Sequence, residues 1–231
     1  MMNQPIPPLH ASQGLSRAPR RKLLRWSLMA PLLVGLLAGC SLLPKSAPVA
    51  LYRLPSALAQ PTASTGGTGN SAQRPESLRV TRPAAGNLLA GQRIIVLPAG
   101  DQVSHYKGAQ WSEPVPLLLR NRLLDALRQD GRIAQLSNDD RMLQADFELD
   151  GELRAFQSVY KDGLPQVLLR LDLRLVRPAT QRIVASRRFE QLQPASDSAL
   201  PAVVSAFGLA SDRLALEVAD WSVAQIEAAA R

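Results

Sequence analysis

Cysteine, aromatic residues and long hydrophobic runs are all scarce in this chain of 231 residues. Its single cysteine, Cys40, excludes an internal disulfide, so the fold has to rest on its hydrophobic core alone. Aromatic residues make up 4% of the sequence and hydrophobic residues 46%, which predicts a core of Leu, Val, Ile and Ala. The apolar run at 28–37 is well below the roughly 18 residues needed to span a bilayer. The length suits one domain.

The first 39 residues have the pattern of a signal peptide. No acidic residue precedes Cys40, whereas five basic residues do: Arg17, Arg20, Arg21, Lys22 and Arg25. The short apolar run that follows ends in Leu37-Ala38-Gly39-Cys40. This looks like a lipobox, in which a bulky apolar residue and two small residues precede an obligatory cysteine. We therefore expect residues 1–39 to be removed by cleavage between Gly39 and Cys40.

Cys40 is then the predicted site of lipidation. Its thiol is the nucleophile that takes up a diacylglyceryl group, and cleavage frees its amine for a further acyl chain. Because each buried CH₂ contributes about 0.8 kcal/mol, two or three chains give stable anchoring where one does not. Ser41, rather than Asp, follows the cysteine, which resembles lipoproteins of the outer membrane that face the periplasm. The alternative is an ordinary secretory signal with a chance cysteine.

The net charge of +8 is misleading as a guide to partners. Removing the five basic residues of the signal peptide from the 27 in the chain leaves 22 against 19 acidic residues, a net charge of +3. The charge therefore gives no case for nucleic-acid binding.

The composition divides the remaining chain in two. Residues 40–76 contain the lipidated cysteine, a tether, a short strand near 51–54 and a Gly/Ser-rich segment at 60–71 that has nothing to bury. Residues 77–231 form the expected globular domain. Strands are predicted at 78–82, 93–97, 105–110 and 133–136.

Two helices are predicted in this domain. The first starts at Ser112 as N-cap, with Glu113 in its first turn and Pro114 beside it, and ends at Gly131. The second covers about 198–229, and its core stripe is expected to contain Val204, Phe207, Leu214, Val218 and Trp221. Gly208 is a weak point in that helix.

The strongest strand signal is an antiparallel meander of 145–156, 168–176 and 182–192, with turns at 161–163 and 178–180. Helices on one face of a mostly antiparallel sheet give an α+β, two-layer sandwich. Along the first of these strands the even positions are all acidic: Asp146, Glu148, Asp150 and Glu152. These carboxylates could act as an acid–base pair or hold Ca²⁺. We favour a solvated face paired across the ladder with Arg170 and Arg174.

The residues needed for other chemistry are missing. His105 is the only histidine after Cys40, and an acylated cysteine cannot ligate metal, so a His₂ or Cys-His zinc site is excluded. Neither a Gly-x-Ser-x-Gly elbow nor a phosphate-binding glycine loop is present. We expect no enzyme, no metal and no cofactor other than the covalent lipid, and we expect His105 in a surface loop or edge strand.

Trp111-Ser-Glu-Pro114 is the most distinctive internal motif. A tryptophan directly before a helix can fix the helix start onto the sheet, which is the interpretation we favour. The alternative is a contact with a partner, for which Trp111, Glu113 and Pro114 are the candidates.

The order of these features resembles the ABC-type transport auxiliary lipoproteins, a family that includes paraquat-inducible protein C. The resemblance is carried by the lipobox Cys40, Tyr52-Arg-Leu54, the strand ending at Leu97-Pro98, Trp111-Ser-Glu-Pro114, the acidic-faced strand, the meander and the final helix with Trp221. It implies a non-enzymatic accessory subunit of a lipid transporter that links the inner and outer membranes. Its partners would be a periplasmic MCE-domain protein with its ABC permease and ATPase, and a homo-oligomer is allowed.

Two other functions remain open at this point. One is an outer-membrane lipoprotein that regulates a peptidoglycan synthase, which a flexible tether would also suit. The other is a hydrolase that uses His105 or the acidic strand face.

Overall fold

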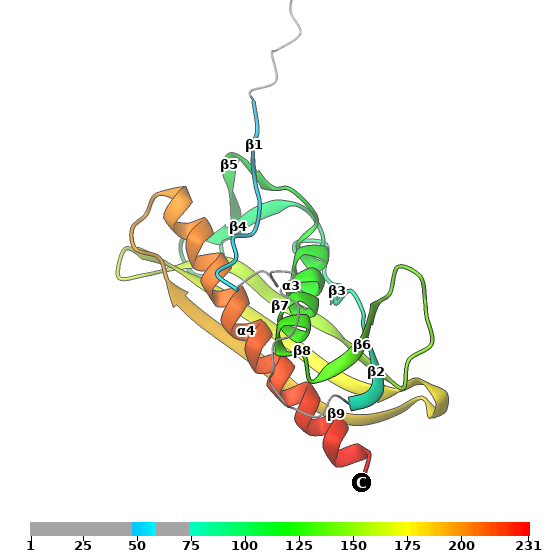
Figure 1. The fold of residues 1–231 in the computed structure, drawn as a ribbon. Coiled ribbons are helices and arrows are strands. Elements are labelled where there is room, and N and C mark those ends of the chain that lie inside the picture. The colour runs from blue at the N-terminus through cyan, green and yellow to red at the C-terminus, as the bar shows by residue number, and fades with distance from the viewer. Residues whose placement is uncertain (1–47, 59–73) are drawn as a thin grey trace, which may run out of the picture. The chain divides into compact units, whose positions relative to one another are not determined.

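The computed structural model describes residues 48–58 and 74–231, and within them nine strands form one sheet with two long helices beside it (Figure 1). The predicted signal peptide, Gly39, Cys40, most of the tether and the Gly/Ser-rich segment lie outside the described residues. The elements in chain order are β1 (Ala50–Tyr52), β2 (Arg74–Val80), β3 (Ala84–Ala85), β4 (Arg93–Leu97), β5 (Ser104–Trp111), α3 (Val115–Asp130), β6 (Ile133–Asn138), β7 (Phe147–Lys161), β8 (Leu164–Arg177), η2 (Pro178–Thr180), β9 (Arg182–Pro194) and α4 (Leu200–Ala229).

The predicted meander is confirmed as β7, β8 and β9, which pair antiparallel over most of their length. Lys161 pairs with Leu164, so Asp162 and Gly163 form a two-residue hairpin turn, and both have positive φ. Glycine reaches that conformation without strain, which explains why the turn falls here. Apolar side chains of β8 at alternate positions, from Val167 to Leu175, lie in the core.

The rest of the sheet is built along the other edge of β7. β2, β3 and β4 follow one another along this long strand, and all three pair parallel to it. β6 pairs parallel to β2, β5 pairs antiparallel to β4, and β1 pairs parallel to β5. The sheet is therefore mixed, although its longest ladders are antiparallel. The predicted α+β, two-layer class is confirmed.

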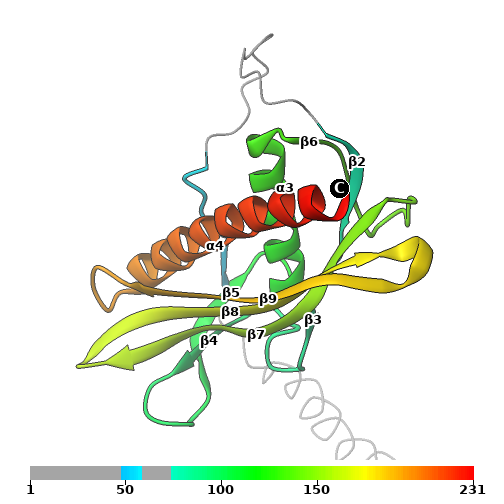
Figure 2. The same cartoon turned by 90° about the horizontal axis from the view of Figure 1, so that it is seen from below.

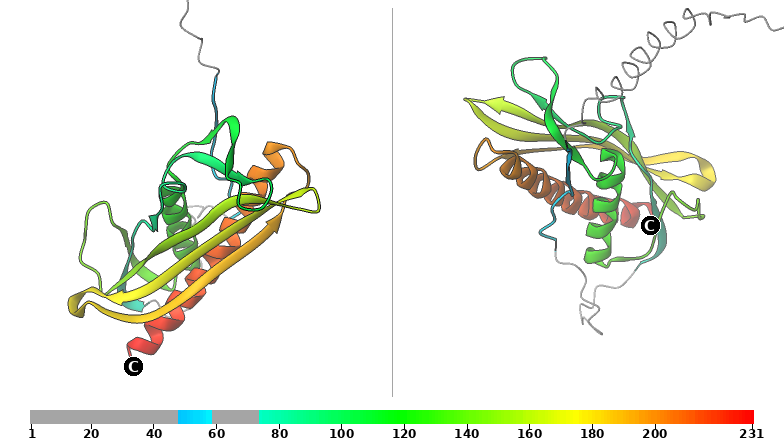
Figure 3. Two further views of the ribbon diagram at one scale, coloured as in Figure 1. Left: turned by 180° about the vertical axis from the view of Figure 1, so that it is seen from behind. Right: turned by 90° about the horizontal axis from the view of Figure 1, so that it is seen from above.

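Both helices lie on the same face of the sheet (Figure 2). The predicted core stripe of α4 is confirmed, because Val204, Phe207, Leu214, Val218 and Trp221 are all buried. The two views of Figure 3, from behind and from above, show α4 running alongside the β8–β9 hairpin. The last helix therefore closes the core over the meander.

A β-bulge in β7 changes which side chains face the helices. The register with β8 shifts between Leu153 and Ala155, so the core positions move from odd to even numbers. Phe156, which continuous alternation places on the outer face, is fully buried as a result. The alternation that places Asp146 to Glu152 on the outer face therefore does not continue to the end of the predicted strand 145–156.

The start of α3 also differs from the prediction. Its N-cap is Pro114, not Ser112, and no side chain caps it. The Pro114 carbonyl accepts hydrogen bonds from the N–H groups of Leu117 and Leu118, 3.0 and 3.1 Å away. Ser112 belongs to the sheet edge instead: its N–H donates to the carbonyl of Tyr52 at 2.8 Å, and its carbonyl accepts from Gln92 Nε2 at 3.0 Å. The predicted end at Gly131 is confirmed, with φ 75°.

Candidate functional site: the N-terminal strap and its hollow

The segment 50–58, called the strap below, is the first described part of the chain to join the domain. β1 extends the sheet beyond β5, with Tyr52 opposite Trp111. Beyond β1, Leu54 and Leu58 pack against the hydrophobic core. The strap therefore belongs to the folded unit, although its composition groups it with the tether.

A buried ion pair holds the strap against both helices. Arg122 of α3 forms a salt bridge with Asp212 of α4, and both side chains are almost completely buried. The same guanidinium donates to the carbonyls of Leu54 and Pro55, at 3.1 and 2.7 Å. Asp212 Oδ2 accepts the Ala57 N–H at 2.7 Å. These two side chains thus bind three backbone groups of the strap, so neither charge is buried without partners.

Gly208 lets the strap approach α4 closely. A Cβ atom at this position would lie 2.8 Å from the carbonyl oxygen of Pro55 and 3.0 Å from its Cβ. Any larger residue would push the strap away from the helix. The glycine that weakens α4 as an isolated helix is therefore required by packing.

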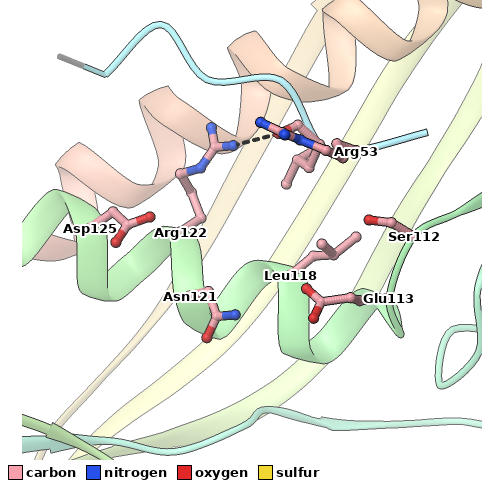
Figure 4. Close-up of a pocket in the computed structure, with 8 residues that line it drawn as sticks. Arg53, Ser112, Glu113, Leu118, Asn121, Arg122 and Asp125 are labelled. Carbon is pink, nitrogen blue, oxygen red and sulfur yellow. Dashed lines mark hydrogen bonds between the residues drawn. The ribbon is translucent and has the colours of Figure 1, made fainter. Parts of the chain in front are cut away.

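An open hollow of about 430 Å³ lies between the strap and the first turns of α3 (Figure 4). Leu54 and Leu118 give it an apolar part. Its remaining lining is polar: Arg53, Ser112, Glu113, Asn121, Arg122 and Asp125. Because Arg122 is neutralised by Asp212 and Asp125 forms a salt bridge with Arg128 at 3.1 Å, the charges available to a ligand come from Arg53 and Glu113. Acidic, basic and amide groups around a small apolar area suit a protein surface better than an acyl chain.

Trp111 lies behind this hollow, in the core. Its side chain is fully buried and packs edge-on against Phe207 and Phe156, with ring centroids 5.2 and 5.9 Å apart. It joins β5, β7 and α4 and fixes the chain just before α3. The favoured structural interpretation thus accounts for Trp111, which exposes no surface to a partner, while Glu113 and Pro114 are exposed.

The acidic face of β7 is occupied by internal partners. Asp150 pairs with Arg174 at 2.5 Å, and Glu152 pairs with Arg154 at 2.8 Å. Glu148 forms a salt bridge with Arg79. Asp146 accepts hydrogen bonds from the N–H and hydroxyl of Ser77, which lower its pKa. The carboxylates therefore serve the solvated face, as we favoured.

The prediction that Arg170 pairs with the acidic face of β7 was wrong. Arg170 pairs with Glu190 of β9 at 2.6 Å, because the bulge leaves Ala155 opposite it on β7. Asp172 instead gathers two arginines, Arg188 and Arg154, whose guanidinium groups lower its pKa to about 2. His105 lies exposed on β5, opposite Ile95.

Within the part of the chain that the structure describes, no three His, Cys, Asp or Glu side chains come together to hold a metal ion. The helices described there include none long and apolar enough to cross a membrane.

Comparison with known sequences shows the family to which this chain belongs. The pattern of the ABC-type transport auxiliary lipoprotein component matches residues 52–219, from the strap to α4. The chain belongs to this family.

Individual relatives agree with the family assignment. The uncharacterized protein bll6063 of Bradyrhizobium diazoefficiens is 32% identical over 148 residues, 64% of this auxiliary lipoprotein. The match spans only 39% of that relative. Protein XCC0632 of Xanthomonas campestris has a similar crystal structure, with a TM-score of 0.70, 26% identity, and coverage of 79% of this chain and 99% of that one. A further uncharacterized protein, with a TM-score of 0.57 and 18% identity over 75% of this chain and 98% of its own, shares the fold.

Sequence reasoning missed the two residues that hold the strap of this auxiliary lipoprotein. Arg122 stands among the apolar positions Leu119 and Leu123 of α3, and Asp212 stands beside Ser211 on the buried side of α4. A charged residue on the apolar face of each of two helices is a signal for a buried pair. The signal gives no hint that the pair also binds the strap.

Proposed function

We propose that this chain is a non-enzymatic, membrane-anchored accessory subunit of an ABC transporter that moves lipids between the inner and outer membranes. Its direct partner would be a periplasmic MCE-domain protein, which the permease and ATPase serve from the inner membrane. Membership of the auxiliary lipoprotein family is the observation that carries the proposal. The lipidated Cys40 would hold the domain on the periplasmic side of the outer membrane.

The hollow beside the strap is the surface we assign to the partner. Glu113 is exposed at its rim, and Arg53 and Asn121 approach it from the strap and from α3 (Figure 4). Its position matters, because the strap continues directly into the predicted tether. A partner bound there would contact the domain and the segment that leads to the membrane together.

An auxiliary role agrees with how the ionisable groups are used. The three carboxylates of β7 are engaged by arginines and Asp146, directly before it, by Ser77, while Asp212 is engaged by Arg122 and the strap. Groups held in this way stabilise a surface and a docked segment. Asp150 and Glu152 do line an open hollow of about 290 Å³, but each of them is paired with an arginine there.

The test is affinity purification of the detergent-solubilised lipoprotein from its own cell envelope, with partners identified by mass spectrometry. We expect the wild-type chain to recover an MCE-domain protein. Glu113→Arg reverses a charge at the rim of the hollow and should greatly reduce that recovery. Arg182→Glu, a charge reversal of the same size and opposite sign at the exposed start of β9, is the control and should leave recovery unchanged.

Each outcome has a distinct meaning. Recovery of cell-wall synthases in place of an MCE-domain protein would refute the transporter role and favour regulation of peptidoglycan synthesis. Recovery that Glu113→Arg and Arg182→Glu reduce equally would move the docking surface away from the hollow and leave the transporter role intact.

A further inference from the structure

One end of the sheet collects the exposed apolar side chains of two hairpins. β4 and β7 run parallel, with Leu97 beside Val159, so the β4–β5 and β7–β8 hairpins turn at the same end. β1 runs parallel to β5, so the chain reaches Ala50 from the side of the β4–β5 turn. We call the two hairpin tips, 98–107 and 159–165, the anchor-side end, because the chain approaches β1 from this side.

Exposed apolar side chains flank both hairpin turns at this end. Val103 is 49% exposed, Tyr160 38% and Leu164 55%, and all three flank the hairpin turns. Tyr160 and Leu164 end and begin the strands around the Asp162–Gly163 turn, and Val103 directly precedes β5. Exposed apolar side chains that come together at one end of a domain are a feature of membrane-contact surfaces.

The charges at the anchor-side end are balanced. The β4–β5 hairpin contributes Asp101 and Lys107, and the β7–β8 turn contributes Lys161 and Asp162, all of them exposed. A surface that is apolar at its tips and neutral around them suits the interface of a bilayer, where tyrosine rings and lysine stems are also accommodated. It offers little electrostatic attraction to an anionic partner.

The predicted anchor limits what can lie against this end. Nine residues lie between Cys40 and Ala50, which makes ten residue steps, so the tether spans at most roughly 33–36 Å when fully extended. A lipid on Cys40 therefore keeps the start of β1 within that distance of the membrane surface. This step rests on the lipid anchor of the proposed function.

We propose that the anchor-side end rests on the phospholipid bilayer and places Val103, Tyr160 and Leu164 in its interfacial region. The lipid on Cys40 and these side chains then act as two membrane contacts, which fix the orientation of the domain. The hollow lies beyond Trp111, at the other end of β5 from Ser104. On the neighbouring strand β4, Ser104 pairs with Val96, and the Trp111 N–H donates to the carbonyl of Gln92. Four residues at about 3.3 Å each place the hollow roughly 13 Å further from the membrane, where a periplasmic partner can reach it.

Quenching by brominated lipid tests the contact directly. The purified mature lipoprotein is reconstituted into phosphatidylcholine vesicles whose acyl chains carry bromine, and the added tryptophan of Leu164→Trp reports proximity. The native Trp111 and Trp221 are almost completely buried, so the parent chain supplies the background. Leu216→Trp is the control, because Leu216 is also exposed, at 44%. It lies sixteen residues along α4 from Leu200, the first residue of the helix, which is a distance of about 24 Å.

We expect Leu164→Trp to lose most of its added fluorescence and Leu216→Trp to lose little. Adding anionic phosphatidylglycerol should leave the quenching unchanged, because the end carries balanced charge. Stronger quenching in anionic vesicles would refute the apolar mechanism. Equal quenching of both variants, or of neither, would refute the proposed orientation.

The mass of the chain, measured before reconstitution, separates this proposal from the proposed function. A chain without lipid on Cys40 refutes the anchor and this proposal together. A lipidated chain with unquenched Leu164→Trp refutes only the membrane contact. Quenching as expected, without recovery of an MCE-domain protein, refutes only the transporter partnership.

Discussion

Helix α4 makes two arginine–aspartate pairs with α3 or the residues just after it, in opposite environments. Asp212 pairs with Arg122 in the core, where the two side chains are 9% and 6% exposed. Asp220 pairs with Arg132 at the surface, at 2.5 Å, with exposures of 75% and 32%. Both pairs join the same two segments of the fold. Burial, not residue type, is the main difference between them.

This difference determines what each pair contributes. The charges of a surface pair stay largely hydrated and are screened by salt, so the pair contributes little to the free energy of unfolding. A buried pair has lost its water, and removing one partner leaves the other charge without solvation. Only the buried pair also binds the strap. Its energetic weight is therefore linked to the segment that leads to the predicted anchor.

Asp212→Ala should have the largest effect of a single change. It leaves the guanidinium of Arg122 buried with only two carbonyls as partners, and we expect a loss of about 3–5 kcal/mol in the free energy of unfolding. Urea denaturation measures the loss, and hydrogen exchange at the Ala57 N–H shows whether the strap has detached.

Two variants sharpen this comparison. Asp220→Ala removes the exposed counterpart and should cost under about 1 kcal/mol. The double variant Arg122→Met/Asp212→Leu replaces the buried pair with apolar side chains and should recover most of the stability. Fast exchange at Ala57 should persist in it. A double variant as unstable as Asp212→Ala would show that packing, not the unpaired charge, causes the loss.

Gly208→Ala should have the next largest effect. Alanine in a helix interior is normally about 1 kcal/mol better than glycine, but here its Cβ would lie within 3.0 Å of Pro55. Overpacking of this kind typically costs about 1–3 kcal/mol, so we expect net destabilisation and faster exchange at Ala57.

Ser205→Ala, on the exposed side of α4, is the control for helix propensity and should be neutral or slightly stabilising. Stabilisation by Gly208→Ala would mean that the strap moves aside at no cost and does not depend on close contact with α4.

The parts of the fold that follow from local pattern could be predicted. The alternation of Leu169, Leu171, Leu173 and Leu175 gave the central strand of the meander, and the stripe from Val204 to Trp221 gave the final helix. The parallel pairing of β2 and β4 with β7 could not be predicted, because the sequence of a short strand does not indicate which strand it pairs with. The bulge beside Arg154 was also hidden, since one extra residue leaves each half of the alternation intact.

The site was less predictable than the fold. The motif at Trp111 marked the correct region, yet the tryptophan itself lies in the core and only Glu113 and Pro114 face outward. The Arg122–Asp212 pair joins residues 90 positions apart and acts on a strap more than 60 positions before Arg122. Contacts at that separation depend on the assembled core, and hydrophobic periodicity does not encode them.

Asp172→Asn should have the smallest effect and the clearest dependence on pH. Asp172 lies on the outer face of β8, and its contacts with Arg188 at 2.6 Å and Arg154 at 3.3 Å lower its pKa to about 2 from an ordinary value of 3.8. Because the folded state favours the charged form, its contribution is present at neutral pH and is lost as the pH falls from about 4 through about 2. Solvent screening limits it to about 0.2–1 kcal/mol.

The measurement is the difference in unfolding free energy between wild type and Asp172→Asn, at pH 7 and at decreasing pH. This difference should shrink as Asp172 of the wild-type chain becomes protonated, and it should also shrink in 1 M salt, where the Debye length is about 3 Å. The loss caused by Asp212→Ala should change little in the same salt, because the pair is shielded from solvent. If salt reduced both losses equally, burial would not be the property that distinguishes the two kinds of pair.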